Sequence, residues 1–130
     1  LHPNDLVMVL RKKGDNKSAL KVCVHALKSH ENDDTLHRNK GNILYALDEP
    51  EKALEAFEKA LDLNPYVVDT WVNKGTVLWK GLAEREKALA AFDKALEINP
   101  NFMAAVDSRI NLMAEIKANR PPFWKRIFGG

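Results

Sequence analysis

The stretch EKALEAFEKALDLNP, at residues 51–65, returns almost unchanged as EKALAAFDKALEINP at residues 86–100. A self-similar unit of this kind indicates a repeat solenoid, in which helix pairs stack side by side and present one extended face to a partner. The sequence therefore predicts a binding function. The repeat itself does not identify the partner.

The spacing of equivalent residues gives the length of the repeat. Gly41 recurs 34 residues later as Gly75, whereas Phe57 recurs 35 residues later as Phe92. One residue has therefore been inserted, and we expect it in a loop at residues 81–84, because loops tolerate insertions. A degenerate first copy precedes these two, since a shift of 34 residues aligns a further apolar set with the second copy: Ala19, Leu20, Ala26 and Leu27.

Each copy has the periodicity of two amphipathic helices. In residues 53–61 the apolar positions are i, i+1, i+4, i+7 and i+8, which form one stripe of an α-helix. Residues 34–47 predict a second helix, and the turn at residues 48–50 folds the two into an antiparallel hairpin. Asn-Pro pairs at residues 64–65 and 99–100 end the later helix of each hairpin. Small residues are expected where helices approach closely: Gly41, Gly75, Ala53, Ala60, Ala88 and Ala95.

These residues resemble the tetratricopeptide repeat family. The second copy supplies the residues of the family pattern at Gly41, Leu44, Ala53, Phe57, Ala60 and Pro65. The third copy supplies Trp71, Gly75, Leu78, Ala88, Phe92, Ala95 and Pro100. The chain departs from the pattern at His37, where tryptophan is usual, and at Lys40 and Lys74, where leucine is usual. The resemblance implies an all-α fold, a right-handed α-solenoid of three helix hairpins with a C-terminal capping helix.

The expected organisation is one repeat domain, residues 1–120, followed by a short tail. Three repeats, a capping helix and the tail are expected, in that order, at about residues 1–33, 34–67, 68–102, 101–118 and 121–130. The apolar residues of the capping helix are expected to face the stack: Phe102, Val106, Ile110, Met113 and Ile116. Its polar residues are expected to point outward: Asp107, Asn111, Glu115 and Lys117.

Length, composition and charge restrict the class of protein. A chain of 130 residues, 45% of them hydrophobic, can form one continuous core. Its net charge of +2 gives no sign of the clustered basic face of a nucleic-acid-binding protein, so we expect no specific nucleic acid, and RNA-binding helical repeats are disfavoured. Cys23, expected to be buried and inert, fits a reducing compartment. We therefore expect a cytoplasmic protein. The sequence has no apolar run of membrane-spanning length, and its start at Leu1 indicates a fragment from which targeting segments could have been removed.

Catalytic and metal-binding patterns are missing from the sequence. The histidines lack the spacing and the cysteine or glutamate partners of a metal site: His2, His25, His30 and His37. No nucleophile lies in a recognisable elbow, and no glycine-rich loop is suited to holding phosphate. We therefore expect no enzyme activity, no catalytic residue, no metal and no cofactor.

The resemblance implies that the first helix of each hairpin lines a concave groove. The register then predicts the side chains that bind a peptide there: Arg11, Arg38, Asn39, Asn42, Tyr45, Asn73, Thr76, Trp79 and Asn111. An asparagine amide both donates and accepts, so a row of asparagines can hold the backbone of an extended peptide. Two alternatives stay open. The asparagines can be solvated residues of an exposed helix face, and Tyr45 and Trp79 can pack in the core.

A narrower resemblance concerns the carboxylate clamp with which some tetratricopeptide domains hold the acidic C-terminal tails of heat-shock chaperones. Arg38, Asn42 and Asn73 stand in the matching register, and an arginine can form two hydrogen bonds with one carboxylate. Ala104 and Ser108 stand where the second pair of cations is expected. The resemblance therefore implies half of a clamp.

The segment FWKRIF, residues 123–128, is the other distinctive feature. Trp124, Ile127 and Phe128 share one face of a predicted helix, with Lys125 and Arg126 opposite. The contact residues predicted for this tail are Phe123, Trp124, Ile127 and Phe128. Such a segment can fold back on the solenoid, dock into a neighbouring molecule or lie on a membrane surface.

Two functions follow from these features. The leading one is an adaptor or scaffold that binds a peptide segment of a protein partner in the concave groove. The alternative is an assembly module, in which the FWKRIF tail joins copies of the chain into a homo-oligomer or attaches the chain to a membrane complex.

Overall fold

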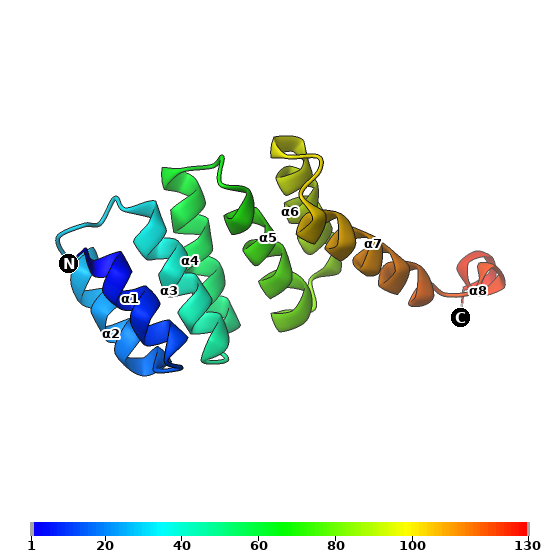
Figure 1. The fold of residues 1–130 in the computed structure, drawn as a ribbon. Helices are drawn as coiled ribbons and strands as arrows, with labels where there is room; N and C mark the ends of the chain where they lie inside the picture. Colours follow the sequence, from blue (N-terminus) through cyan, green and yellow to red (C-terminus); the bar gives the residue numbers. More distant parts are fainter. Residues whose placement is uncertain (1, 130) are drawn as a thin grey trace.

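The computed structural model describes residues 2–129, whose regular elements are all helices (Figure 1). In chain order they are α1 (Pro3–Lys12), α2 (Asn16–Leu27), α3 (Asp34–Ala46), α4 (Pro50–Leu63), α5 (Val68–Thr76), the π-helical turn η1 (Val77–Gly81), α6 (Arg85–Ile98), α7 (Met103–Ala118) and α8 (Phe123–Phe128). The pairs α1–α2, α3–α4 and α5–α6 form three hairpins, and α7 packs against α6. The expected all-α solenoid is confirmed. Leu1 and Gly130, the ends of the predicted domain and tail, lie outside the described residues.

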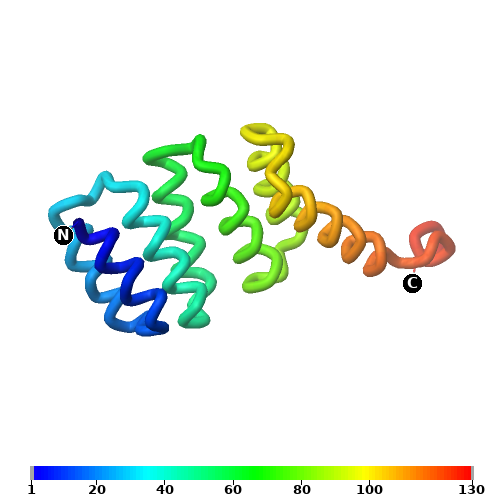
Figure 2. Tube along the Cα trace, viewed as in Figure 1, coloured from blue at the N-terminus to red at the C-terminus, as the bar shows by residue number. Residues whose placement is uncertain are grey.

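The hairpins stand in a row that follows the sequence. Figure 2 shows α1 and α2 at one end, α5 and α6 further along, and α7 continuing away from the last hairpin. Helices α1 and α8 therefore lie at opposite ends of the molecule. Each hairpin contacts mainly its neighbours, as expected for a solenoid.

Short local signals determine where the helices begin. The Asp15 carboxylate accepts a hydrogen bond from the Ser18 amide at 3.1 Å, and Asp33 does the same for Leu36 at 3.1 Å. These bonds satisfy amides that have no partner within the first turn. The hydrogen bonds from Ser18 also keep the pKa of Asp15 below its ordinary value. Pro50 occupies the start of α4, where its missing N–H is not needed.

Small residues allow the two helices of a hairpin to approach each other. A Cβ on Gly41 would lie 2.6 Å from the Phe57 ring, and one on Gly75 would lie 2.5 Å from the Phe92 ring. Both rings are buried, so they fill the space that the glycines leave. The alanines expected at the close contacts are also buried: Ala53, Ala60, Ala88 and Ala95. The predicted role of these small residues is confirmed.

The extra residue of the third repeat lies inside a helix. After α5 the chain forms one π-helical turn, in which the Leu82 amide donates to the Val77 carbonyl, five residues back, at 3.0 Å. At the equivalent place in the second repeat, the Leu47 amide donates to the Ile43 carbonyl, four residues back, at 2.9 Å. A π turn accommodates one additional residue in a helix.

The loops after these two helices correspond residue for residue. Asp48 and Ala83, 35 residues apart, both have positive φ, 62° and 55°. The insertion therefore lies in the π turn, before Leu82. Of the predicted residues 81–84 only Gly81 belongs to that turn, and the expectation that a loop holds the extra residue is wrong. Gly81, the last residue of this turn, lies against the second repeat, where an added Cβ would be 2.8 Å from the Cβ of Pro50. Glycine fits this site because it has no side chain.

Helix α7 packs through only part of the face that was expected, since Ile116 packs as predicted, Phe102 and Val106 are partly buried, and the buried face is turned away from Ile110 and Met113. Ala105 and Leu112 are fully buried, and Ile116 packs against the same cluster of core residues as Leu112. Ile110 and Met113, which were expected to face the stack, have 59% and 42% of their surface exposed. Because α7 carries apolar residues on both faces, periodicity alone cannot select the buried one.

A polar contact also joins α7 to the stack. The Trp79 indole N–H donates to the Glu115 carboxylate, and Arg85 Nε lies 3.4 Å from the same oxygen. The expectation that Glu115 points outward is therefore wrong. The hydrogen bond from Trp79 lowers the pKa of Glu115, and the positive charges of Arg85 and Lys80 lower it further. Burial acts in the opposite direction, and the net result is a pKa below the ordinary value.

Helix α8 forms over the residues of the FWKRIF segment and buries none of them. Figure 1 shows it beyond the end of α7, away from the three hairpins, so the structure does not show the fold-back arrangement. Within residues 2–129, no helix combines the length and the apolar character that a bilayer crossing requires.

Candidate peptide-binding groove

The first helices of the three hairpins bring polar side chains into one cavity, which we call the groove. It has a volume of about 480 Å³ and is lined by Asn4, Asp5, Met8, Arg11, Thr35, Arg38, Asn39, Asn42, Asp69 and Asn73. The repeat explains this convergence, because Asn39 and Asn73 occupy equivalent positions on α3 and α5. From the predicted binding set, the groove collects Arg11, Arg38, Asn39, Asn42 and Asn73.

Asn39 lies at the base of the groove and positions a cation. Only 5% of its surface is exposed. Its side-chain oxygen accepts from Arg11 Nη1 at 3.2 Å, and its amide nitrogen donates to Asn4 Oδ1 at 3.0 Å. These bonds satisfy the polar atoms of a buried side chain, and leaving those atoms without partners would destabilise the fold. Asn39 therefore holds the Arg11 guanidinium in place.

Asn42 and Asn73 join two neighbouring repeats. Asn73 Nδ2 donates to Asn42 Oδ1 at 3.0 Å, and both side chains are partly exposed in the groove. An asparagine amide has two N–H donors and an oxygen with two lone pairs. The bond between them therefore leaves the Asn42 amide nitrogen available as a donor and the Asn73 oxygen as an acceptor. A peptide backbone offers the complementary carbonyl and N–H groups.

The charges around the groove are mixed. Arg38 Nη1 lies 3.8 Å from the carboxylate of Asp34, one turn earlier on α3, and both side chains are partly buried. Asp5 and Asp69 line the groove on α1 and α5. Arg11 and Arg38 are therefore balanced in part by neighbouring carboxylates. A guanidinium has five N–H donors, so one ion pair does not exhaust its capacity.

The remaining predicted residues do not line the groove. Thr76 Oγ1 donates to the Val72 carbonyl of its own helix at 3.0 Å. Tyr45 packs against the core of the second hairpin, and Asn111 is exposed on α7. For Tyr45, packing is therefore the interpretation that the structure favours.

Trp79 has a structural environment of its own. Its ring meets Phe92 edge to face at 6.3 Å between centroids, and Lys80 Nζ lies 3.9 Å from its centroid. Its indole N–H donates to the Glu115 carboxylate. Sequence reasoning missed this contact, because the partner lies 36 residues away on α7 and was expected to point outward. Trp79 therefore connects the third hairpin to α7.

The second pair of cations of a carboxylate clamp is not replaced by a neighbouring arginine. Arg109 Nε donates to Asp93 Oδ1 on α6 at 2.6 Å. Ala104 is exposed and Ser108 is partly exposed on the same helix. Arg109 therefore serves the packing of α7 against α6, and the groove keeps its cations at the end formed by α1 and α3.

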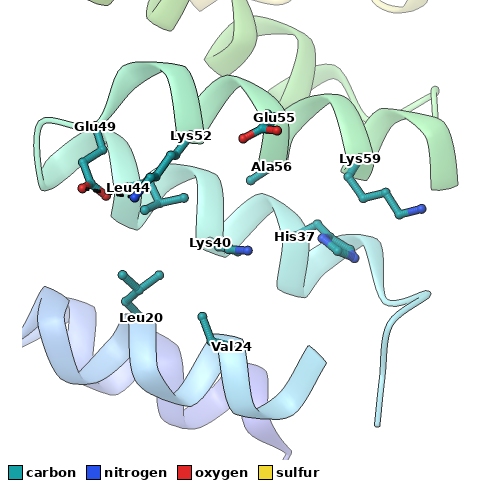
Figure 3. A pocket seen from close by; sticks show the side chains of 10 residues that line it. All are labelled: Leu20, Val24, His37, Lys40, Leu44, Glu49, Lys52, Glu55, Ala56 and Lys59. Atoms are coloured by element: carbon teal, nitrogen blue, oxygen red, sulfur yellow. Dashed lines mark ion pairs between the residues drawn. The ribbon is translucent and has the colours of Figure 1, made fainter. Parts of the chain in front are cut away.

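Two further clefts lie between successive hairpins. The first, drawn in Figure 3, has a volume of about 460 Å³ and is lined by Leu20, Val24, His37, Lys40, Leu44, Glu49, Lys52, Glu55, Ala56 and Lys59. The second, of about 470 Å³, is lined by Leu54, Glu58, Trp71, Lys74, Leu78, Glu84, Lys87, Ala90, Ala91 and Lys94. Sequence reasoning did not identify them, although the recurrence of lysines in the repeat was a usable signal.

The two clefts are lined by corresponding residues of successive hairpins, which indicates that both arise from the stacking of helices. Each is lined by leucine and alanine from the contact between hairpins, and each has one close pair of opposite charges among its lining residues. Glu49 lies 3.7 Å from Lys52, and Glu84 lies 3.3 Å from Lys87. Such exposed pairs are common on helix surfaces and contribute little energy. The groove, in contrast, gathers groups from three repeats.

The site has no arrangement that would hold a metal. Among the residues that the structure describes, no group of three or more His, Cys, Asp and Glu side chains is placed to hold an ion. Cys23 is fully buried, and burial raises the pKa of its thiol to about 11. A thiol in this state is a poor nucleophile and a poor metal ligand.

Comparisons with known proteins agree with the repeat pattern. Tetratricopeptide repeat models match residues 35–66 and residues 68–102. A search of the curated proteins found no match.

Solved structures share the fold over most of this chain. The first repeat domain of Spaghetti (RPAP3), bound to the HSP90 peptide SRMEEVD, has a TM-score of 0.84 at 16% identity, covering 88% of this chain and 90% of that one. The second repeat domain of human RPAP3, in complex with the HSP70 peptide SGPTIEEVD, has a TM-score of 0.80 at 17% identity, covering 85% and 92%. YrrB, described as having an unusual peptide-binding site, has a TM-score of 0.77 at 30% identity, covering 82% of this chain and 55% of YrrB. The chain belongs to the tetratricopeptide repeat family.

Proposed function

We propose that this chain is a protein-interaction module that binds an extended peptide segment of a partner protein in the groove. The observation that carries the proposal is the convergence of two guanidinium groups and a hydrogen-bonded pair of amides from α1, α3 and α5. The proposal assigns the chain a binding role and no catalytic step. It also agrees with the solved relatives that were determined with bound peptides.

Asn42 and Asn73 bind the peptide backbone. They belong to adjacent repeats, so a peptide that runs along the row of hairpins meets both of them. The donor of Asn42 pairs with a peptide carbonyl, and the acceptor of Asn73 pairs with a peptide N–H. These two hydrogen bonds recognise the peptide backbone in one direction and are compatible with different peptide side chains.

Arg38 and Arg11 select an acidic group on the same peptide. Asn39 fixes Arg11, and Asp34 restrains Arg38, so both guanidiniums are ordered before the ligand arrives. Because Arg109 is engaged by Asp93, the groove recognises one carboxylate rather than the two that a complete clamp would hold. The peptides of the two RPAP3 complexes end in acidic sequences, and the related chemistry here is a peptide with a single acidic anchor.

The test is a peptide-display selection on the 130-residue chain and on the Asn42→Ala/Asn73→Ala variant. The expected result is a motif with a conserved acidic position, enriched by the parent chain and bound about ten- to hundredfold more weakly by the variant. Lys52→Ala/Lys59→Ala, in the cleft of Figure 3, is the matched control and should bind as the parent does. Circular dichroism verifies that all three are folded.

A second pair of variants examines the carboxylate. Arg38→Lys keeps the charge but loses the two-pronged geometry, and Arg38→Ala loses both. The order of affinity for the selected peptide should be parent, lysine, alanine, and amidation of its acidic group should remove the difference. An enriched motif that the asparagine variant binds as well as the parent does, or one without an acidic position, would contradict the proposal.

A further inference from the structure

Helix α8 exposes four large apolar side chains. The exposed fractions are 74% for Phe123, 58% for Trp124, 58% for Ile127 and 81% for Phe128. No residue of this helix is buried. Exposed aromatic and aliphatic groups gathered on one short helix indicate a surface that is covered in use.

The side chains of α8 are sorted around the helix axis. With 100° between successive residues, Phe123, Ile127, Trp124 and Phe128 fall within an arc of about 140°. Lys125 and Arg126 fall on the two borders of that arc, each about 60° outside it. Lys125 Nζ also lies 5.4 Å from the centroid of the Trp124 ring, which brings a cation beside the apolar face.

The sequence on either side of and within α8 carries charge of one sign. Glu115 is the last acidic residue of the chain, and the charged residues after it are all basic and exposed: Lys117, Arg120, Lys125 and Arg126. In a chain whose net charge is only +2, this end is strongly positive, and the remainder is slightly negative. The positive end is therefore suited to an anionic partner.

We propose that α8 binds the surface of an anionic lipid bilayer. The apolar arc enters the boundary between headgroups and acyl chains, and Trp124 lies at that boundary, as indoles commonly do. Lys125 and Arg126 extend to the phosphates on both sides of the helix. A protein groove would need acidic residues along both of its walls to match these two borders, whereas an anionic membrane supplies negative charge on every side.

The position of α8 leaves the rest of the molecule free. Pro121 and Pro122 separate it from α7, and Figure 1 shows it at the far end of the molecule from α1. Attachment through α8 therefore keeps the groove of α1, α3 and α5 open. One short helix gives reversible binding, so the attachment depends on the anionic lipid and on the ionic strength.

Vesicle co-sedimentation of the 130-residue chain tests the proposal. The chain should sediment with vesicles of phosphatidylcholine and phosphatidylserine, and should stay in solution with phosphatidylcholine alone. High salt should reduce the bound fraction. Lys125→Glu/Arg126→Glu should lower the partition coefficient at least about tenfold, since two cations are lost and each one near an anionic surface contributes a factor of about five.

Two controls make the outcome specific. Lys87→Glu/Lys94→Glu changes the charge equally on α6, and should retain most of the binding. Trp124→Ala/Phe128→Ala keeps the cations and should also lose binding, because the apolar arc is reduced. Equal binding to neutral vesicles, or binding that both α8 variants retain, would overturn the proposal. So would a tail-dependent oligomer, seen by sedimentation without lipid, that does not bind vesicles.

Discussion

Glycine and phenylalanine form matched pairs in two hairpins. The ring of Phe57 lies where a side chain of Gly41 would be, and the ring of Phe92 lies where a side chain of Gly75 would be. The distance between the helices of each hairpin is therefore limited by the aromatic ring and not by the backbone. One added methyl group at either glycine has no space to occupy.

Gly75→Ala should destabilise the chain by about 1–3 kcal/mol, because the new methyl group overlaps the Phe92 ring and forces the hairpin to open. Equilibrium denaturation with urea measures the change. The double variant Gly75→Ala/Phe92→Leu removes the overlap, so its two single effects should not add. Full additivity would show that the ring does not determine the helix separation.

Cys23 should resist modification in the folded protein. It is fully buried and its pKa is raised to about 11 by burial, so little thiolate forms and no reagent reaches it. Labelling with a thiol reagent at neutral pH should be at least about a hundredfold slower than labelling of the urea-unfolded chain. Rapid labelling under native conditions would mean that α2 opens locally.

For individual residues, the sequence predicted contacts within a repeat better than contacts between elements. The glycines, the alanines and Cys23 were identified because their neighbours lie in the same hairpin or follow the helical period. The bond from Trp79 to Glu115 was not, because it depends on how α7 is rotated. The burial of Asn39 was also missed, since its partners Asn4 and Arg11 lie in the first repeat, which matches the family pattern poorly.

Among the elements, α7 shows the limit of periodicity most directly. It has two apolar faces, and only contact with α6 decides which is buried. Ala105 and Leu112 lie on the packed face, and Met103 and Ile110 lie on the exposed one. The sequence could predict that the helix exists and that it ends at about Ala118, but not its rotation about its own axis.

Substitutions on the two faces of α7 should have opposite consequences. Leu112→Ala should cost about 2–5 kcal/mol of unfolding free energy, because it leaves a cavity in a fully buried site. Ile110→Ala, a comparable truncation on the exposed face, should change it by less than about 0.5 kcal/mol. Urea denaturation of both variants checks the assignment. If Ile110→Ala were the more destabilising variant, α7 would pack through the face that periodicity predicted.

The contact of Glu115 should make α7 sensitive to acid. Its pKa is lowered in the folded state, so its contribution to stability is present above the ordinary glutamate value of 4.5 and is lost as the pH falls through the lowered value. Glu115→Gln should therefore be less stable than the parent at neutral pH, and the difference should shrink below pH 4.5. Denaturation midpoints across this range test it.

Glu58→Gln, which removes an exposed carboxylate from α4, is the matched control for that experiment. It reports the effect of losing one surface charge without a Trp79 contact. If the difference in stability between the parent and Glu115→Gln is the same at every pH, the carboxylate does not need its charge to bind the Trp79 indole.

At the scale of the whole molecule, the order of the hairpins could be predicted from repetition alone. The groove could be predicted only in part. Residues on α1, α3 and α5 converge as the register implied, whereas Tyr45, Thr76, Trp79 and Asn111 serve packing, their own helix or solvent. Of these four residues, Trp79 lies in the π turn after α5, which a constant register does not anticipate.

Removing residues 121–130 should leave the solenoid as stable as before. The side chains of α8 are exposed and contribute no buried surface to the hairpins. We expect the unfolding free energy to change by less than about 0.5 kcal/mol, with an unchanged helical spectrum apart from the lost segment. Thermal denaturation followed by circular dichroism measures it. A large loss of stability would mean that the tail packs on the solenoid.

The π turn at Val77–Gly81 also affects how such proteins are recognised from sequence. Because it absorbs one residue within a helix, the landmarks before it keep a spacing of 34 and those after it move to 35, while the loop and the next helix keep their conformations. A search that requires a constant period would divide this unit into two weak half-matches. Profiles that allow a one-residue gap shortly before the turn, rather than in it, should find related units more sensitively.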